Sequence, residues 1–270
     1  AVARAALGPR IGWMAGPAAM IPSLDMHGFS VSLLPADDAR VRALAAPVAL
    51  TAWPGLNPLG QVEVRPLPDG LSPIQPVPSP HPARRTVIET CCKALIAVEK
   101  ELNALDAKSG DGDTGSTLAT AARALVAALD RLPLADATQL YRAIGMELAQ
   151  TMGGSSGVML ARFLAAARDA SAGGKEWIGA LSAGLDRVMQ VGGAEPGHRT
   201  MIDALAPALA ALPQGLAAAA KAARSGADGT AAMTRARAGR ASYLSADKLA
   251  GFNDPGAEGV AVLFETLARG

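Results

Sequence analysis

Residues 102–117 read Leu102-Asn-Ala-Leu-Asp106-Ala-Lys-Ser-Gly110-Asp111-Gly112-Asp113-Thr114-Gly115-Ser-Thr117. Asp106, Asp111 and Asp113 bring three carboxylates within eight residues, and the glycines between them permit sharp turns of the backbone. Three acids at this spacing repel each other unless a cation lies between them. Oxygen ligands without a neighbouring His or Cys favour a hard cation such as Mg²⁺ over zinc. The sequence therefore predicts a magnesium site.

The same residues predict a phosphate ligand. Mg²⁺ is usually held by one or two carboxylates and completes its coordination with phosphate oxygens and water. A helix is expected to begin at about Gly115, and the free N–H groups and positive dipole end of a helix N-terminus favour an anion. A solvated Asp-Gly loop and a calcium loop are the alternatives. The EF-hand pattern is absent, because Asp106 lies five residues before Asp111 and no acid follows Asp113 for many residues.

Composition argues against several classes of protein. A formal net charge of +1 gives no electrostatic basis for nucleic-acid binding, and no basic run resembles a membrane anchor. No apolar run reaches the ~20 residues of a membrane span, and Arg10, Gly16 and Pro17 interrupt the N-terminal apolar residues, which argues against a signal peptide. Cys91 and Cys92 are adjacent on an expected helix and cannot form a disulfide without strain, so we expect a reducing, cytoplasmic setting.

The chain divides by composition into three segments. Within residues 1–66, apolar and polar residues alternate at Phe29–Leu34 as in a β-strand, and Val48–Pro54 resembles a strand end or a loop. These elements are too few for a complete α/β domain. Residues 67–84 carry a proline at nearly every second or third position, as in a semi-rigid linker. Residues 85–270 have a helical apolar period instead. We therefore place a domain boundary in the proline-rich segment.

Residues 85–270 predict a series of amphipathic helices, the first of which should end at Asp106. Further helices are expected around residues 177–189 and 214–237, and the high alanine content with 3% aromatic residues indicates close packing. The apolar residues that mark the helix faces are Ile88, Cys92, Leu95, Val98, Leu102 and Leu105; Leu118, Ala122, Leu125 and Leu129; Leu140, Ile144 and Leu148; and Val260, Leu263, Phe264 and Leu267.

Three later loops share the chemistry of the first, which is glycine, a small hydroxyl or an acid, and a helix start. They are Met152-Gly153-Gly154-Ser155-Ser156-Gly157, residues 191–203, and Asn253-Asp254-Pro255-Gly256. Ser155 or Ser156 is expected to cap a helix that begins near Val158, and Asp254 and Pro255 suit the N-cap and first helical positions. Each loop alone is equally typical of an ordinary helix connection. In an up-and-down bundle all four would lie at one end and form one site.

The loop at residues 191–203 holds three further candidates. Arg199 could reach a phosphate and Met201 could pack on a purine face, although an ordinary loop would use the same residues. His198 lacks a spaced partner, so we expect a solvated loop side chain rather than a metal ligand or a base.

Five motifs, in order, resemble the nucleotide-binding (L) domain of dihydroxyacetone kinases over residues 85–270. They are Asp106-x4-Asp111-Gly-Asp113-Thr-Gly, Gly153-Gly-Ser-Ser-Gly157, Glu195-Pro-Gly-x-Arg-Thr-Met-Ile-Asp203, Gly239-Arg-Ala-Ser-Tyr243 and Asp254-Pro-Gly256. Residues 23–30 and Ala52-Trp53-Pro54 resemble the last segment of the ketose-binding (K) domain of single-chain, ATP-dependent members of the family.

The resemblance implies a mainly α fold, an eight-helix up-and-down barrel preceded by a small partial α/β segment, with ATP or ADP at the open end of the barrel. Asp106, Asp111 and Asp113 would hold two Mg²⁺ ions that bridge the phosphates. The residues implied to line the nucleotide are Thr114, Gly115, Ser116, Thr117, Ser155, Ser156, Gly192, Thr200, Met201, Arg240, Asp254, Pro255 and Gly256. The resemblance assigns no catalytic residue to this chain.

The resemblance also implies that residues 1–66 are a remnant of a K domain, residues 67–84 a linker and residues 85–270 the L domain. In the family, a histidine of the K domain holds the ketose covalently and a Gly-rich loop binds its hydroxyls. Neither segment occurs here, since His27 and His81 do not lie in such a motif, and Pro22 stands where a threonine is usual. We therefore expect Mg-ATP binding without a complete acceptor site, and a K domain in a longer chain or in another subunit.

The expected function is ATP-dependent phosphoryl transfer to dihydroxyacetone or a related short ketose or triose, with this chain supplying the Mg-ATP site. The alternatives are the ADP-binding subunit of a phosphotransferase-dependent dihydroxyacetone kinase and a non-catalytic nucleotide-binding module. The proline-rich linker and the K-like residues favour the first. A fatty-acid kinase type shares the Asp-Gly-Asp-Thr-Gly loop but has Asn in place of Asp106, so it ranks lower. We expect a cytoplasmic homodimer with no nucleic-acid or membrane partner.

Overall fold

A computed structural model of the chain describes residues 11–16, 18, 31–49, 53–59 and 76–270. The chain forms two compact units, residues 1–73 and residues 74–270. The division falls inside the proline-rich segment, while the assignment of residues 1–66 to a K-type domain stays a prediction. In the described part of the chain, each helix is too short or too polar to cross a membrane.

The described part of the first unit holds a short antiparallel pair and one helix. Strands β1 (Trp13–Ala15) and β2 (Leu56–Pro58) pair with Met14 opposite Asn57, and helix α2 (Asp38–Ala45) follows an Asp37 cap. The strand predicted at Phe29–Leu34 is wrong for residues 31–34, which are exposed and outside any strand. Alternation alone does not make a strand, because a strand also needs a partner for its backbone N–H and C=O groups.

Some residues of the K-domain resemblance cannot be placed. Residues 19–30, which include Pro22 and His27, and residues 50–52 lie outside the described residues. Trp53 and Pro54 are described and form an irregular connection before β2. The K-domain resemblance of this segment therefore rests on sequence alone.

The second unit is helical. Its α-helices are α3 (Pro82–Ala97), α4 (Glu99–Asp106), α5 (Thr114–Ala128), α6 (Ala137–Thr151), α7 (Gly154–Ala172), α8 (Trp177–Gly192), α9 (Ile202–Ala211), α10 (Leu216–Thr230) and α11 (Pro255–Arg269). Short 3₁₀ turns lie at η2 (Leu129–Arg131), η3 (Leu212–Gln214), η4 (Arg240–Tyr243) and η5 (Ala246–Lys248). Only Val98 separates α3 from α4, so the described part of this unit consists of eight helical elements.

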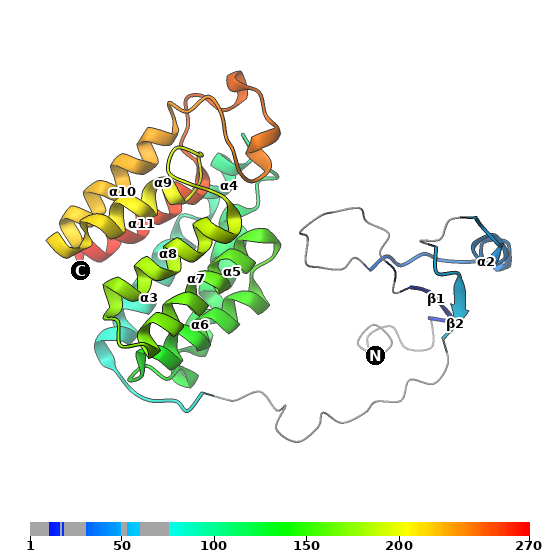
Figure 1. The fold of residues 1–270 in the computed structure, drawn as a ribbon, viewed down its shortest axis with the longest axis horizontal. Coiled ribbons are helices and arrows are strands. Elements are labelled where there is room, and N and C mark those ends of the chain that lie inside the picture. The colour runs from blue at the N-terminus through cyan, green and yellow to red at the C-terminus, as the bar shows by residue number, and fades with distance from the viewer. Residues whose placement is uncertain (1–10, 17, 19–30, 50–52, 60–75) are drawn as a thin grey trace. The chain divides into compact units, whose positions relative to one another are not determined.

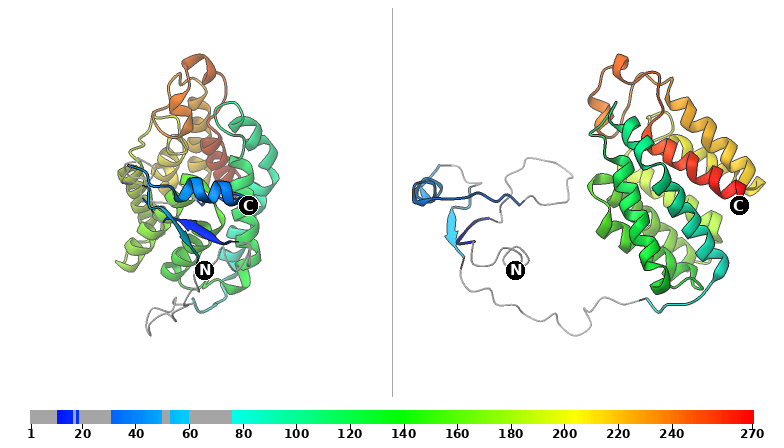
Figure 2. Two further views of the ribbon diagram at one scale, coloured as in Figure 1. Left: turned by 90° about the vertical axis from the view of Figure 1, so that its right-hand side faces the viewer. Right: turned by 180° about the vertical axis from the view of Figure 1, so that it is seen from behind.

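The eight elements form a closed ring. Each helix packs against the next in the sequence, and α11 packs against α3 and α4, which closes the ring (Figures 1 and 2). Consecutive helices run in opposite directions, so the connections α4–α5, α6–α7, α8–α9 and α10–α11 all lie at one end. This arrangement confirms the predicted eight-helix up-and-down barrel, and it places all four glycine-containing loops at the same end.

Alanine allows α9, α10 and α11 to pack closely. The residues at their contact that have no exposed surface are Ala204, Ala208, Ala223, Ala227, Ala257 and Ala261. Larger side chains fill the opposite side of the ring, where Leu125, Leu148 and Met152 pack with Cys92. The close helix packing predicted from the composition is confirmed.

Some predicted boundaries are wrong. Helix α7 begins at Gly154 without a side-chain cap, so Ser155 and Ser156 lie in its first turn rather than before it. Helix α10 ends at Thr230, although the alanine-rich pattern predicted a helix to residue 237. The Thr230 hydroxyl accepts the N–H of Asp254 at 2.8 Å, which ties the end of α10 to the start of α11. Amino-acid composition cannot predict this helix end, because the hydrogen bond joins residues that are far apart in the sequence.

Candidate functional site

Asp106 is the residue around which the acidic loop folds. It is the last residue of α4, and only 8% of its surface is exposed. Its Oδ2 accepts the N–H groups of Asp113 at 2.9 Å and Thr114 at 3.2 Å. Its backbone carbonyl accepts those of Ser109 at 2.9 Å and Gly110 at 2.6 Å. These four hydrogen bonds bend residues 107–113 back toward the end of α4.

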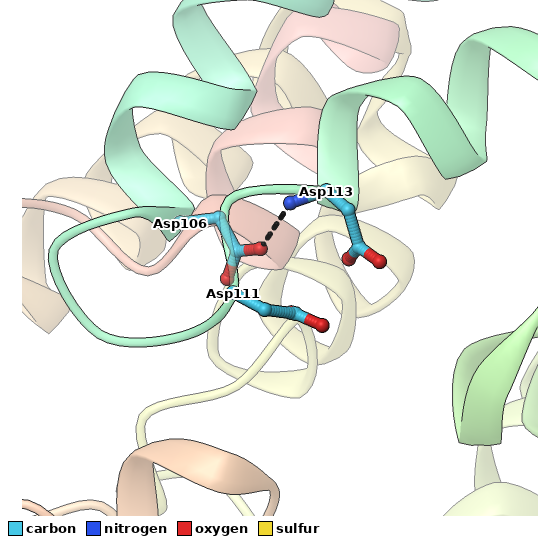
Figure 3. A group of neighbouring side chains, drawn as sticks. All are labelled: Asp106, Asp111 and Asp113. Atoms are coloured by element: carbon cyan, nitrogen blue, oxygen red, sulfur yellow. Dashed lines mark hydrogen bonds between the residues drawn. The ribbon is translucent and has the colours of Figure 1, made fainter.

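The bend brings the three acids together. One carboxylate oxygen from each of Asp106, Asp111 and Asp113 lies within 4.8 Å of the others, and Figure 3 shows the side chains gathered beside the start of α5. Asp106 is buried, whereas the other two are exposed. Gly112 has a φ of +79°, a backbone conformation that glycine adopts without steric cost. Such a set of oxygen donors suits a hard divalent cation, which would offset the mutual repulsion of the acids.

A second network fixes the start of α5, and the sequence analysis did not anticipate it. Asn103 accepts the N–H of Ser116 at 3.0 Å and donates to its hydroxyl at 2.9 Å. That hydroxyl donates to Glu99 at 3.1 Å, and Glu99 also pairs with Arg123. The hydrogen bond from Arg123, together with that from Ser116, lowers the pKa of Glu99. Asn103 does not stand out in the sequence, because most residues of α4 are polar or charged.

This network changes the prediction for the first turn of α5. The N–H groups of Thr114, Ser116 and Thr117 donate to protein acceptors, namely Asp106, Asn103 and the Asp113 carbonyl. The prediction that these N–H groups are free to bind an anion is therefore wrong for these three residues. The Ser116 hydroxyl points into the network between α4 and α5. Its predicted contact with a nucleotide would require this network to rearrange.

Residues predicted from the α6–α7 and α8–α9 loops lie at the same end of the barrel. Ser155 and Ser156 are exposed in the first turn of α7. The Ser156 hydroxyl donates to the Gly153 carbonyl at 3.3 Å. Gly192 is the last residue of α8 and is exposed; a Cβ there would lie 3.6 Å from the Met159 sulfur of α7. The end of α8 therefore lies beside the beginning of α7.

The α8–α9 loop is held by Asp203. Its carboxylate accepts the N–H of Gly197 and, at 2.7 Å, that of Thr200. Met201 is partly buried and packs against the cores of the α7–α9 and α9–α11 regions. A Cβ on Gly256 would lie 3.2 Å from the Met201 Cβ, so this loop touches the start of α11. Thr200, Met201 and Gly256 are thus neighbours, although their contact with a nucleotide stays a prediction.

Two other residues of this loop have structural roles. Arg199 is 1% exposed and donates to the carbonyls of Leu249 and Phe252, both at 3.0 Å. The idea that Arg199 reaches a phosphate is therefore wrong, because its guanidinium is enclosed by protein. His198 is partly buried, and its Nδ1 accepts the N–H of Glu195 at 3.1 Å. It belongs to no group of candidate metal ligands in the described part of the chain.

The loop before α11 confirms the predicted cap. Asp254 is the N-cap, its carboxylate accepts the N–H of Ala257 at 2.9 Å, and Pro255 is the first helical residue. Burial raises the pKa of Asp254 to about 6, an effect that the nearby Asp203 increases and the positive charge of Arg199 opposes. The Arg240 side chain lies outside the described residues, so its predicted contact is not placed.

The α10–α11 connection also lies over the acidic loop. A hollow between the two is lined by Lys108, Ser109, Gly110, Asp111, Leu244 and Lys248. The Lys108 ammonium lies 5.2 Å from the centre of the Phe252 ring. The structure therefore brings the acidic loop, the α8–α9 loop and the α10–α11 connection into contact. It also places Lys108 and Lys248, which the sequence did not single out, beside the acidic loop.

Comparisons with known proteins agree with this architecture. The DAK2 domain pattern matches residues 108–269. Dihydroxyacetone kinase of Citrobacter freundii is 41% identical over 273 residues, which cover 99% of this chain and 50% of that protein. Triokinase/FMN cyclase of Homo sapiens is 34% identical over 266 residues, which cover 91% of this chain and 46% of that protein.

A solved structure matches as well. The crystal structure of the dihydroxyacetone kinase from C. freundii in complex with AMP-PNP and Mg²⁺ has a TM-score of 0.65 and 37% sequence identity, covering 96% of this chain and 47% of that chain. The chain thus spans about half the length of the relatives that it matches. These matches confirm the resemblance that the five ordered motifs indicated.

Proposed function

The chain belongs to the DAK2-domain family, and we propose that it supplies the Mg²⁺–nucleotide site of a kinase that transfers the γ-phosphoryl group of ATP to dihydroxyacetone or a related short ketose or triose. One observation carries the proposal. Three carboxylate oxygens converge within 4.8 Å at the end of the barrel where all four helix-start loops lie. A related kinase of the same fold was crystallised with AMP-PNP and Mg²⁺, which supports nucleotide and metal as the ligands here.

The chemistry of the donors fits Mg²⁺. Asp106, Asp111 and Asp113 offer only oxygen, and no His or Cys belongs to the cluster. Two such ions would neutralise charge on the phosphates and on the three acids, which is the main requirement of phosphoryl transfer. Asp106 contributes rigidity, since its Oδ2 is fixed by the N–H groups of Asp113 and Thr114. The exposed acids then face the solvent from which a metal–nucleotide complex would enter.

The nucleotide would lie across the neighbouring loops. We place Thr114, Gly115, Thr117, Ser155, Ser156, Gly192, Thr200, Met201, Arg240, Asp254, Pro255 and Gly256 around it, with Ser116 included only if its hydroxyl leaves Asn103. The common end of the barrel supports this set. The exposed Ser155 offers a hydroxyl donor, and Ser156 would do so once its hydroxyl leaves the Gly153 carbonyl. The turn at Asp254 is rigid because it is capped and begins with proline.

The acceptor would be held elsewhere. We propose that residues 1–66 are the end of a K-type domain, that residues 67–84 are a linker and that residues 85–270 are the nucleotide-binding domain. A complete K domain, in a longer chain or in another subunit, would then bind the ketose. A cytoplasmic homodimer completes the proposal. An ADP-binding subunit that takes its phosphoryl group from a phosphohistidine protein would use the same site and is separated by the experiment below.

The test has a binding stage and a transfer stage. At an ATP concentration of about 100 times Kd with Mg²⁺ present, binding should stabilise the chain by roughly 2.7 kcal/mol, seen as a raised Tm. ATP with EDTA in place of Mg²⁺ is the control. No shift with Mg-ATP would refute the proposal. Transfer from ATP to dihydroxyacetone is then measured with and without an added K domain; transfer only from a phosphohistidine protein would favour the ADP-subunit alternative.

A further inference from the structure

Arg199 is a buried cation in the α8–α9 loop that the proposed chemistry does not use. Its side chain is 1% exposed, and one terminal nitrogen, Nη2, donates to the carbonyls of Leu249 and Phe252 at 3.0 Å each. Its guanidinium carbon lies 4.8 Å from the centre of the Phe252 ring, within the range of a cation–π contact. Arg199 therefore holds the residues that lead into the Asp254 turn from the inner side.

This arrangement is energetically expensive. Nε and Nη1 of Arg199 are buried and have no hydrogen-bond partner among the described residues. Arg199 is also the non-glycine residue of the described chain with a positive φ, +58°, which L-residues rarely adopt. A buried cation with incomplete hydrogen bonding is costly in general. Strain of this kind is found at functional sites, where the surrounding structure holds it in place.

We propose that Arg199 is a positioning residue of the nucleotide site: it fixes the segment before α11, so that the Asp254-Pro255-Gly256 turn is presented in one conformation. This inference rests on the proposed function, because the turn matters only if it contacts the nucleotide. Arg199 itself touches no ligand. Its effect passes through Leu249 and Phe252.

The charges around Asp254 support this role. Arg199 faces it from the α8–α9 loop with a positive charge, and Asp203 faces it from α9 with a negative charge. The neighbouring group on α10 is the uncharged Thr230, whose hydroxyl accepts the Asp254 N–H. Within α11, the N–H of Ala257 donates to the carboxylate. Arg199 is therefore the positive charge that, together with the N–H groups of Ala257 and Gly256, opposes the effects of burial and of Asp203 on the pKa of Asp254.

Phe252 extends the effect to the acidic loop. Its ring contacts Arg199 at 4.8 Å and the ammonium of Lys108 at 5.2 Å, measured to the ring centre. Lys108 lies two residues after Asp106. The segment that leads into the nucleotide turn is thus in contact with the loop that carries the acids, and fixing one helps to fix the other.

The experiment compares Arg199→Met and Arg199→Lys in the full chain. Methionine fills similar space without charge, whereas lysine keeps the charge and some hydrogen-bonding capacity. Arg187→Met, an exposed residue of α8, is the matched control. Two quantities are measured between about pH 5 and about pH 8, a range that includes the titration of Asp254. They are the Kd for ADP with Mg²⁺, and the pKa of Asp254 in the ligand-free protein by carboxyl ¹³C NMR.

We expect Arg199→Met to weaken Mg-ADP binding about tenfold, since a charged hydrogen-bond donor is lost. The pKa of Asp254 should rise above its value of about 6, because the neighbouring positive charge is gone. The pH below which binding weakens should rise with it. Arg199→Lys should restore the pKa and most of the affinity, and Arg187→Met should change neither.

The results that would overturn the inference are distinct from failure of the proposed function. Wild-type affinity and an unchanged Asp254 titration in Arg199→Met would overturn it, as would equal effects in Arg187→Met. If Arg199→Met does not fold, Phe252→Leu replaces it, and normal Mg-ADP affinity in that variant would also overturn it. A wild-type chain that does not bind Mg-ADP would refute the proposed function, and the ligand-free titration would still test the link between Arg199 and Asp254.

Discussion

The Oδ2 atom of Asp106 lies 2.9 Å from the backbone nitrogen of Asp113, seven residues further along the chain. One oxygen of a buried acid is thus committed to holding the backbone of an exposed acid in the same cluster. Asp106 therefore combines two roles, as a loop anchor and as a candidate metal ligand. The three acids should consequently differ in how substitution affects stability and binding.

Replacing either exposed acid should remove the metal site and preserve the fold. Asp111→Asn or Asp113→Asn is expected to abolish Mg²⁺-dependent nucleotide binding, while the Tm of the ligand-free chain stays the same or rises. The reason is that loss of one acid from a cluster of like charges relieves repulsion. Calorimetric titration with Mg-ATP and thermal unfolding measure the two effects. Unchanged ATP affinity in both variants would contradict the metal assignment.

Replacing the buried acid should also destabilise the protein. Asp106→Ala leaves the N–H groups of Asp113 and Thr114 without their acceptor, which should lower the free energy of unfolding by about 1–3 kcal/mol. Asp106→Asn keeps a carbonyl acceptor and should lose less stability, although it should bind Mg-ATP as poorly. Urea unfolding of the two variants makes the comparison. Equal stability of Asp106→Ala and the wild type would show that these hydrogen bonds do not anchor the loop.

The start of α5 should not accept a side chain at residue 115. A Cβ on Gly115 would lie 2.0 Å from the Glu99 carbonyl oxygen and 2.8 Å from Asn103 Oδ1, so α4 and α5 would have to separate. Gly115→Ala is expected to cost about 2 kcal/mol or more in unfolding free energy. Gly229→Ala in α10 is the matched control, because a Cβ there meets nothing within 4 Å. That control should be neutral or stabilising by about 0.5–1 kcal/mol, and similar losses in both variants would argue against the close contact.

Asp254 should make stability depend on pH in a defined direction. Its pKa is raised from 3.8 to about 6 in the folded protein, so between these values the folded state binds more protons at this residue than the unfolded state. The contribution of Asp254 to stability therefore falls as the pH rises through this window. In the Asp254→Asn variant, the asparagine can still cap the helix, but its side chain does not titrate. The wild-type minus variant difference in unfolding free energy should fall by roughly 3 kcal/mol at most, and a constant difference would contradict the shift.

Much of the fold followed from local pattern. The apolar period of residues 85–270 located the barrel helices, and Asp254 and Pro255 marked the start of α11 as the structure has it. The same approach failed at residues 31–34, where alternation lacked a strand partner, and at the end of α10, where alanine continues past Thr230 without helix. At the end of α10, the hydrogen bond between Thr230 and Asp254 joins residues that are 24 positions apart in the sequence.

Part of the candidate site was also readable in advance. The spacing of Asp106, Asp111 and Asp113 predicted that their carboxylates meet, and they do. The supporting residues were not found, because Asn103 and Glu99 act through a serine that follows them by 13 and 17 residues. No periodicity marks such a pair.

By itself, the sequence determined the acidic loop, the order of the five motifs and the antiparallel series of helices, since each depends on neighbouring residues or on a short repeat. Tertiary structure alone decided where Arg199 and Ser116 point. Arg199 bonds to carbonyls 50 and 53 residues away and is enclosed beneath Phe252, although a glycine-rich loop had suggested an exposed phosphate ligand. The physical reason is that a hydrogen-bonding side chain takes whichever acceptors the packed helices bring within reach, and only the closed ring brings these together.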